Sequence, residues 1–222
     1  MTHSEQTDQL EQDTLKSNDA TDRAALNQRH AQRMQRKKAL IDAKIAQAQT
    51  RRGLMIVNCG NGKGKSSSGL GMVMRALGHD KKVGIVQFIK GAMSTGEEKF
   101  LRRFPDMVSF HAMGEGYTWN TQDRERDIAR AQLAWQQALV FLRDPEIALV
   151  LLDEVNIALK YHYLDVTTVL QDLRQRPPLQ HVILTGRGAL AEVIEAADTV
   201  SEIMEVKHAF KQGVAAQECI EW

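Results

Sequence analysis

The chain has 222 residues, of which 43% are hydrophobic, and its formal net charge is +1. A chain of this size can bury a substantial core, so we expect one α/β domain with appendages. The near-neutral charge argues against a nucleic-acid partner. Two cysteines are too few for a disulfide framework or a cysteine zinc site. No apolar stretch approaches the roughly 18 residues of a membrane span and no signal peptide is visible, so we expect no membrane association and a cytoplasmic protein.

The first 52 residues differ from the rest in composition. Residues 1–21 are polar and acidic, which predicts a disordered leader. Residues 22–52 then form a predicted basic amphipathic helix, and from Arg23 to Arg52 there are nine Lys or Arg but a single acid, Asp42. Composition leaves three uses open: a solvated helix docked by a thin apolar stripe, an arm over a phosphate-rich site, or a nucleic-acid contact. The apolar stripe consists of Leu26, Met34, Ile41 and Ile45.

From residue 53 to residue 222, apolar runs alternate with helical patterns. This rhythm predicts a P-loop NTPase-like (RecA-like) α/β domain with a mostly parallel sheet flanked by helices. Ligands of such sheets bind at the carboxyl ends of the strands. The predicted helices include 66–78, 122–142 and 189–196. The predicted strands are 54–59, 83–88, 107–112, 147–153, 181–186 and 199–206.

The run LMIVNCGNGKGKSSS over residues 54–68 predicts a phosphate-binding loop between a strand and a helix. Glycines allow backbone N–H groups to converge on an anion, Lys65 adds a positive charge, and the Ser66 hydroxyl suits Mg²⁺. The first glycine of the usual pattern is replaced by Cys59, so a standard nucleotide hydrolase does not follow. The predicted nucleotide ligands are Gly60, Asn61, Gly62, Lys63, Gly64, Lys65, Ser66 and Ser67.

A second candidate lies at the carboxyl end of the predicted strand 147–153. Asp153 and Glu154 stand where that strand should end, at the edge of the sheet where the phosphate loop also opens. Acids in this position would hold Mg²⁺ directly or through water, opposite Ser66. The alternative is that Asp153 and Glu154 are an ordinary helix N-cap and an acid of the first helical turn. The phosphate loop favours the metal site.

Three reactions are compatible with these residues. A regulatory GTPase is disfavoured because residues 53–222 lack its Asp-x-x-Gly and Asn-Lys-x-Asp motifs. A hydrolytic ATPase could use Glu154 as a base, and a small-molecule kinase belongs to the same alternative. In the third reaction the triphosphate is not cleaved, and it departs from the nucleotide as one unit.

Seven short motifs appear in one order along the chain. Together they closely resemble the ATP:corrinoid adenosyltransferases of the cobalamin pathway, in their phosphate-loop family, over roughly residues 24–222. That family also lacks the first glycine of the loop; Ser66 replaces its usual Thr and Tyr117 its Phe. The motifs are GNGKGKS (60–66), VQFIKG (86–91), GYTWNTQ (116–122), LLDE (151–154), TGRG (185–188), ADTVSE (197–202) and KHAFKQGV (207–214).

The resemblance implies that Co(I) of a corrinoid or cobalamin attacks C5′ of ATP and that triphosphate departs. Lys65 and Mg²⁺ (or Mn²⁺) would stabilise the leaving group, and Arg187 would contact the nucleotide. Tyr117 and Trp119 would pack on the lower face of the corrin and expel its axial ligand, easing the reduction of Co(II). The family also implies a homodimer and an electron donor such as a reduced flavoprotein.

Overall fold

The computed structural model describes residues 3–89, 94–113 and 123–221, with the backbone alone for residues 3–22 and 24. The chain divides into two compact units, residues 1–51 and 52–222. The first contains helix α1 (His3–Gln47), which includes most of the stretch where composition predicts a disordered leader. Residues 1–52 contain no glycine or proline that would end a helix. The boundary at residue 21 stays a prediction.

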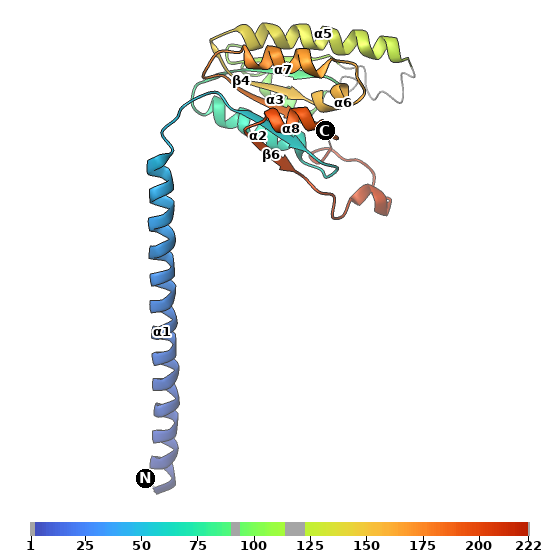
Figure 1. Ribbon diagram of the computed structural model, residues 1–222. Helices are drawn as coiled ribbons and strands as arrows, with labels where there is room; N and C mark the ends of the chain where they lie inside the picture. Colours follow the sequence, from blue (N-terminus) through green and yellow to red (C-terminus); the bar gives the residue numbers. More distant parts are fainter. Residues whose placement is uncertain (1–2, 90–93, 114–122, 222) are drawn as a thin grey trace. The chain divides into compact units, whose positions relative to one another are not determined.

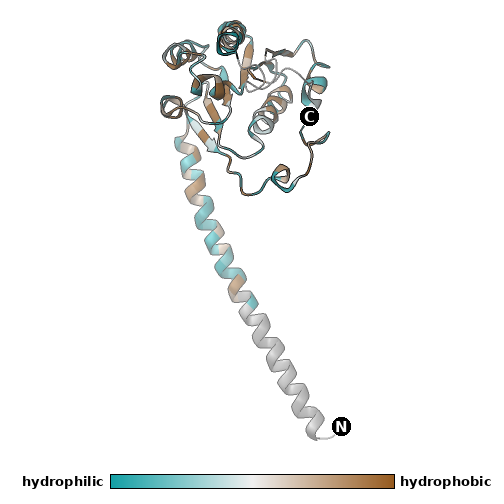
Figure 2. Ribbon diagram, turned by 90° about the vertical axis from the view of Figure 1, so that its right-hand side faces the viewer, coloured by the Kyte–Doolittle hydropathy of each residue, from teal (hydrophilic) through white to brown (hydrophobic). Residues whose placement is uncertain are grey.

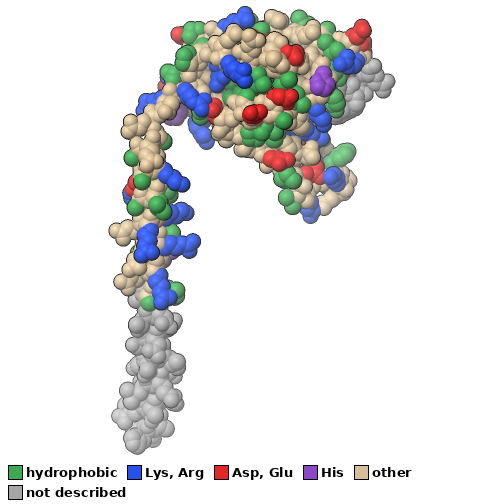
Figure 3. Space-filling model, viewed as in Figure 1, with side chains coloured by type: hydrophobic (Ala, Val, Ile, Leu, Met, Phe, Trp, Pro, Cys, Tyr) green, Lys and Arg blue, Asp and Glu red, His purple; other side chains and the backbone are tan. Residues whose placement is uncertain are grey.

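From residue 25 to its end, helix α1 exposes both its basic and its apolar residues. In Figure 2 its described part is mostly hydrophilic with separate hydrophobic residues, and in Figure 3 Lys and Arg side chains stand out along it. Leu26 and Ile45 are about two-thirds exposed. The apolar stripe expected from the sequence is therefore present and solvent-facing within this unit.

The second unit contains a six-stranded sheet in the order β3-β2-β4-β5-β1-β6, and every neighbouring pair is parallel. This confirms the predicted α/β fold. All six predicted strands form, with ends shifted by up to four residues. They are β1 (Met55–Cys59), β2 (Lys82–Gln87), β3 (Val108–Ala112), β4 (Ile147–Asp153), β5 (His181–Thr185) and β6 (Thr199–Glu202).

Helices cover both faces of this sheet (Figure 1). Helices α2 (Lys65–Leu77) and α3 (Gly96–Leu101) bury Leu70, Val73 and Leu101 against one face. The opposite face is covered by α5 (Arg124–Arg143), α6 (Val155–Lys160), α7 (Val166–Arg174) and α8 (Ala191–Ala196). Connections toward β3 use the first face and connections toward β6 use the second, as right-handed crossovers require.

Burial explains the strand sequences. In β4 every residue except Ala148 is buried, which accounts for the unbroken apolar run 147–152 before the buried Asp153. The helices that sequence periodicity left unnamed, α3, α6 and α7, have nine residues or fewer. Segments of that length show barely two turns of periodic pattern, and their helical form depends on packing and on caps such as Asp165, whose side chain accepts the Thr168 N–H.

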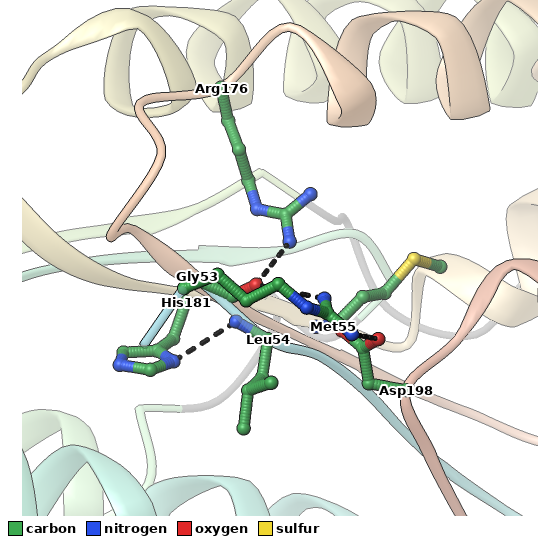
Figure 4. A network of polar contacts seen from close by, with 7 residues as sticks. Gly53, Leu54, Met55, Arg176, His181 and Asp198 are labelled. Atoms are coloured by element: carbon green, nitrogen blue, oxygen red, sulfur yellow. Dashed lines mark hydrogen bonds and ion pairs between the residues drawn. The ribbon is translucent and has the colours of Figure 1, made fainter. Parts of the chain in front are cut away.

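A polar network joins the amino ends of β1 and β5, at the edge of the sheet opposite the predicted phosphate loop (Figure 4). Asp198 forms an ion pair with Arg52 and also accepts the Met55 N–H at 2.8 Å. The hydrogen bond from Arg52, followed by that from Met55, holds the pKa of Asp198 below its usual range. Arg176 donates to the Gly53 carbonyl at 3.3 Å, and His181 Nδ1 accepts the Leu54 N–H at 3.1 Å.

Replacing Asp198 with Asn should lower the stability of the protein in a pH-dependent way. Because Arg52 is half exposed, the loss at neutral pH should be about 1 kcal/mol. Since the folded-state pKa of Asp198 is depressed, its contribution is complete above the unfolded value of about 4 and disappears as pH falls through the folded value. Urea unfolding from pH 7 to pH 3 measures this. Asp106→Asn, at an exposed acid, is the control; a deficit that stays constant down to pH 3 would contradict the assignment.

Candidate functional site

The predicted phosphate loop lies between β1 and α2. Gly64, with φ of 116°, turns the chain into α2 in the left-handed region that favours glycine. Among the described helices, α3, α5 and α7 begin with a side-chain cap, whereas α2 has none, and neither have the six-residue helices α6 and α8. The first backbone N–H groups of α2 therefore face the loop without a capping side chain, an arrangement suited to an anion.

The chain after β6 holds the loop from one side. Ile203 accepts the Gly62 N–H at 2.7 Å and donates its own N–H to the Cys59 carbonyl at 2.9 Å. The approach is close: a Cβ on Gly62 would lie 2.6 Å from the Met204 carbonyl oxygen. Glycine is therefore needed at residue 62 for contact with backbone, in addition to any contact with phosphate.

The two lysines of the loop have different surroundings. Lys65 is half-buried, and its Nζ donates to the Gly62 carbonyl at 2.6 Å, so the ammonium lies over the loop. Lys63 is exposed and pairs with Glu221 at 2.8 Å, so a bound nucleotide would compete with Glu221 for it. Burial raises the pKa of the neighbouring Cys59 thiol, which keeps this residue neutral.

The acidic pair lies at the same edge of the sheet. Asp153 is 1% exposed, and its two carboxylate oxygens accept hydrogen bonds from Thr185 Oγ1 at 2.7 Å and from Gln87 Nε2 at 3.0 Å. Glu154 is half-buried and adopts a left-handed conformation with φ of 63°. Its N–H donates to Thr185 Oγ1 at 2.9 Å.

The donor set fits Mg²⁺. Ser66 and Glu154 supply a hydroxyl and a carboxylate, the oxygen ligands that this ion prefers. Over the described ranges 3–89, 94–113 and 123–221, no three His, Cys, Asp or Glu side chains gather as a metal site. An ion here would therefore depend on few protein ligands together with phosphate oxygens, which is how Mg²⁺ is commonly bound.

The sheet brings the loop and the acids together through β5. Asn58 and Thr185 are opposite one another in the β1–β5 register. The Asn58 carbonyl accepts the Gly186 N–H at 3.2 Å, and its Nδ2 donates to Ser68 Oγ on α2 at 3.3 Å. Arg187 follows in the turn after β5 and is exposed, as are Asn61 and Ser67. Tyr117 and Trp119 lie outside the described residues.

Sequence reasoning missed three buried polar residues of this edge: Asn58, Gln87 and Thr185. Each is the last or next-to-last residue of its strand. Gln87 and Thr185 also fall within the VQFIKG and TGRG motifs. A polar residue that interrupts an apolar run just before a glycine-rich turn was the available signal.

Comparisons with known proteins agree with this geometry. Residues 51–222 match the family described as ATP:corrinoid adenosyltransferase BtuR/CobO/CobP, and residues 18–45 match a model described as Cob(I)alamin adenosyltransferase N terminal. The chain is 62% identical over 196 residues to a corrinoid adenosyltransferase of Pseudomonas aeruginosa, covering 88% of this chain and 97% of that protein. It is 49% identical over 191 residues to one of Escherichia coli, covering 86% and 96%. A Salmonella typhimurium protein named corrinoid adenosyltransferase CobA is 46% identical over 196 residues, covering 88% and 99%.

Gly62→Ala should remove most nucleotide binding, because its Cβ would collide with two backbone carbonyls that cannot rotate away. Gly71→Ala is the matched control. A Cβ there meets nothing within 4 Å, so alanine in the middle of α2 should leave binding intact and stabilise the protein by about 0.5–1 kcal/mol. Nucleotide titration calorimetry with thermal melting separates the two effects. Normal affinity in Gly62→Ala would contradict the close contact of the loop with Ile203 and Met204.

Proposed function

This chain belongs to the ATP:corrinoid adenosyltransferases and adenosylates corrinoids with ATP, and we propose that its phosphate loop binds the triphosphate of ATP as the leaving group. The observation that carries the proposal is the uncapped start of α2, with Gly64 turned into the left-handed region and Lys65 folded over the loop. These groups place backbone N–H donors beside one cation, which suits a polyanion.

In the proposed reaction the Co(I) atom attacks C5′ of the ribose. A cobalt–carbon bond forms, the bond from C5′ to the triphosphate oxygen breaks, and the triphosphate departs with the electron pair. Negative charge therefore grows on the leaving group. The Lys65 ammonium and the backbone N–H groups of the loop stabilise that charge from fixed positions, so little reorganisation is needed during the reaction.

We propose that Mg²⁺ (or Mn²⁺) is held beside the triphosphate by Ser66 and Glu154, and that Asp153, the other acid predicted from the sequence, supports this site indirectly. An ion bound there would neutralise part of the negative charge on the phosphates. Because the Co(I) nucleophile carries no proton, the reaction needs no general base, and Glu154 does not act as one. Its role in holding the metal distinguishes this reaction from hydrolysis by an ATPase, where a carboxylate would activate water.

The corrinoid side of the site is proposed from the family resemblance. Tyr117 and Trp119 pack on the lower face of the corrin, which leaves Co(II) four-coordinate and easier to reduce. Lys63 and Arg187 contact the bound nucleotide. We also propose that the protein is a homodimer in the cytoplasm. A reduced flavoprotein would be its electron donor. Within the described residues, no helix combines the length and apolarity needed to cross a bilayer.

Product analysis tests the leaving-group proposal. Protein, Mg-ATP and chemically reduced corrinoid should give inorganic triphosphate and a carbon–cobalt bond in equal amounts. Lys65→Ala should weaken ATP binding about 10- to 100-fold, since it removes a charged donor at the phosphates. Lys81→Ala, at an exposed lysine after α2, is the control. Release of phosphate or ADP in place of triphosphate, or normal ATP affinity in Lys65→Ala, would overturn the proposal.

The aromatic residues are tested by separating reduction from transfer. Replacing Tyr117 and Trp119 with Ala should abolish activity that starts from Co(II) corrinoid and a mild reductant, because the axial ligand then stays in place. Activity should largely persist when Co(I) is supplied, since the phosphate loop is unchanged. Spectroscopy of Co(II) corrinoid with Mg-ATP should show the four-coordinate species only with the unmodified protein. Equal failure with both cobalt states would refute the assignment to the corrin.

A further inference from the structure

Three buried polar side chains meet at the carboxyl ends of adjacent strands. Gln87 on β2, Asp153 on β4 and Thr185 on β5 are each at most 5% exposed. A carboxylate in such a place is costly unless donors surround it. Asp153 receives one donor from each neighbouring strand, Gln87 Nε2 at 3.0 Å and Thr185 Oγ1 at 2.7 Å. Both of its oxygens are thus engaged by the protein itself.

The Thr185 hydroxyl has only one arrangement that satisfies its neighbours. An ionised carboxylate can only accept, so the single hydroxyl proton must go to Asp153 Oδ1. The oxygen of Thr185 then accepts the Glu154 N–H at 2.9 Å. Asp153 therefore orients the hydroxyl, and the hydroxyl in turn holds the backbone of the next residue along the chain.

That backbone adopts an uncommon conformation. Glu154, with φ of 63° and ψ of 17°, lies in the left-handed region that few residues other than glycine adopt. It stands at the start of α6, where its side chain forms no cap. The left-handed turn sets the direction of the Cα–Cβ bond, and it persists only where surrounding contacts impose it. The hydrogen bond to Thr185 is such a contact.

We propose that Thr185 is a positioning residue for Glu154, and that Asp153 acts through Thr185 and not as a direct metal ligand. The hydroxyl fixes the left-handed backbone of Glu154 and so aims its carboxylate at the metal–triphosphate unit. This inference rests on the proposed role of Glu154 in holding the metal. Groups that orient a metal ligand typically change metal affinity about 10- to 100-fold when they are removed.

Three variants test it. Thr185→Val keeps the volume and removes the hydroxyl, whereas Thr185→Ser keeps the hydroxyl and removes the methyl group. Thr167→Val makes the same chemical change on the exposed side of α7 and is the matched control. Two measurements are made on each protein: Mn²⁺ binding to the protein–ATP complex by electron paramagnetic resonance, and hydrogen exchange of the Glu154 amide. Thermal melting checks the fold.

Thr185→Val should weaken Mn²⁺ binding about 10-fold or more and speed exchange of the Glu154 amide, and Thr185→Ser should stay within about threefold of the unmodified protein. Unchanged Mn²⁺ affinity with a protected Glu154 amide in Thr185→Val would overturn the inference. So would equal losses in the Ser and Val variants, because the hydroxyl would then be irrelevant. If Thr185→Val does not fold, Thr185→Cys replaces it, since a thiol is a weak hydrogen-bonding group.

Glu154→Gln separates this inference from the function on which it rests. Weaker Mn²⁺ binding in Glu154→Gln together with normal binding in Thr185→Val would overturn the positioning role alone. Normal Mn²⁺ binding in Glu154→Gln would overturn the metal role of Glu154. In Asp153→Asn, any loss of Mn²⁺ affinity should be accompanied by faster exchange of the Glu154 amide. A loss of metal binding with the amide fully protected would make Asp153 a direct ligand and refute the proposal.

Discussion

Parallel pairing of β1 with β5 on one side and β6 on the other places the phosphate loop between two neighbouring strand ends. Because parallel strands all end at one edge, the turn after β5 and the chain after β6 both emerge beside the loop. One side supplies the contact of Asn58 with Gly186, and the other supplies the hydrogen bond between Gly62 and Ile203. The loop is therefore held by backbone groups from both neighbours, which fixes the conformation of its backbone.

The same edge concentrates the buried polar groups of the sheet. Among the described residues, most buried polar side chains belong to strand ends or turns around the loop, while the interior of the sheet is apolar. Gln180 is an exception with a structural role, since its Nε2 donates to carbonyls at the end of α5 and the start of β4. Burying polar groups costs stability unless they are paired. Here the pairing holds Asp153, Thr185 and Glu154 in one relative arrangement.

Strand β5 lies between the strand of the phosphate loop and the strand of the acids. This order explains why Thr185 can link them, since its hydroxyl reaches Asp153 while its backbone pairs with β1. The acids are thus coupled to the loop through an intermediate strand, and a change at the end of β5 affects both. The separation of the loop and the acids is then set by the sheet and not by flexible loops, which suits two elements that are proposed to bind one triphosphate unit.

Much of this arrangement could be predicted from the sequence, because it depends on neighbours in the chain. Buried parallel strands need continuous apolar runs, and a glycine-rich turn before a helix is a local feature. The six strands, the glycine-rich turn between β1 and α2, and the positions of Asp153 and Glu154 at the end of β4 were therefore visible in the residue pattern. The short helices α3, α6 and α7 were not, since their form depends on packing more than on periodicity.

The amino-acid sequence by itself determined the fold class and the family to which the chain belongs. Only the tertiary structure decided that Ile203 and Met204 close on the loop, that Glu221 pairs with Lys63, and that Asp153 is enclosed by Gln87 and Thr185. These contacts join residues 32 to 158 positions apart. No local pattern encodes such pairs, because they arise from the order of the strands and from the cost of leaving a buried carboxylate without donors.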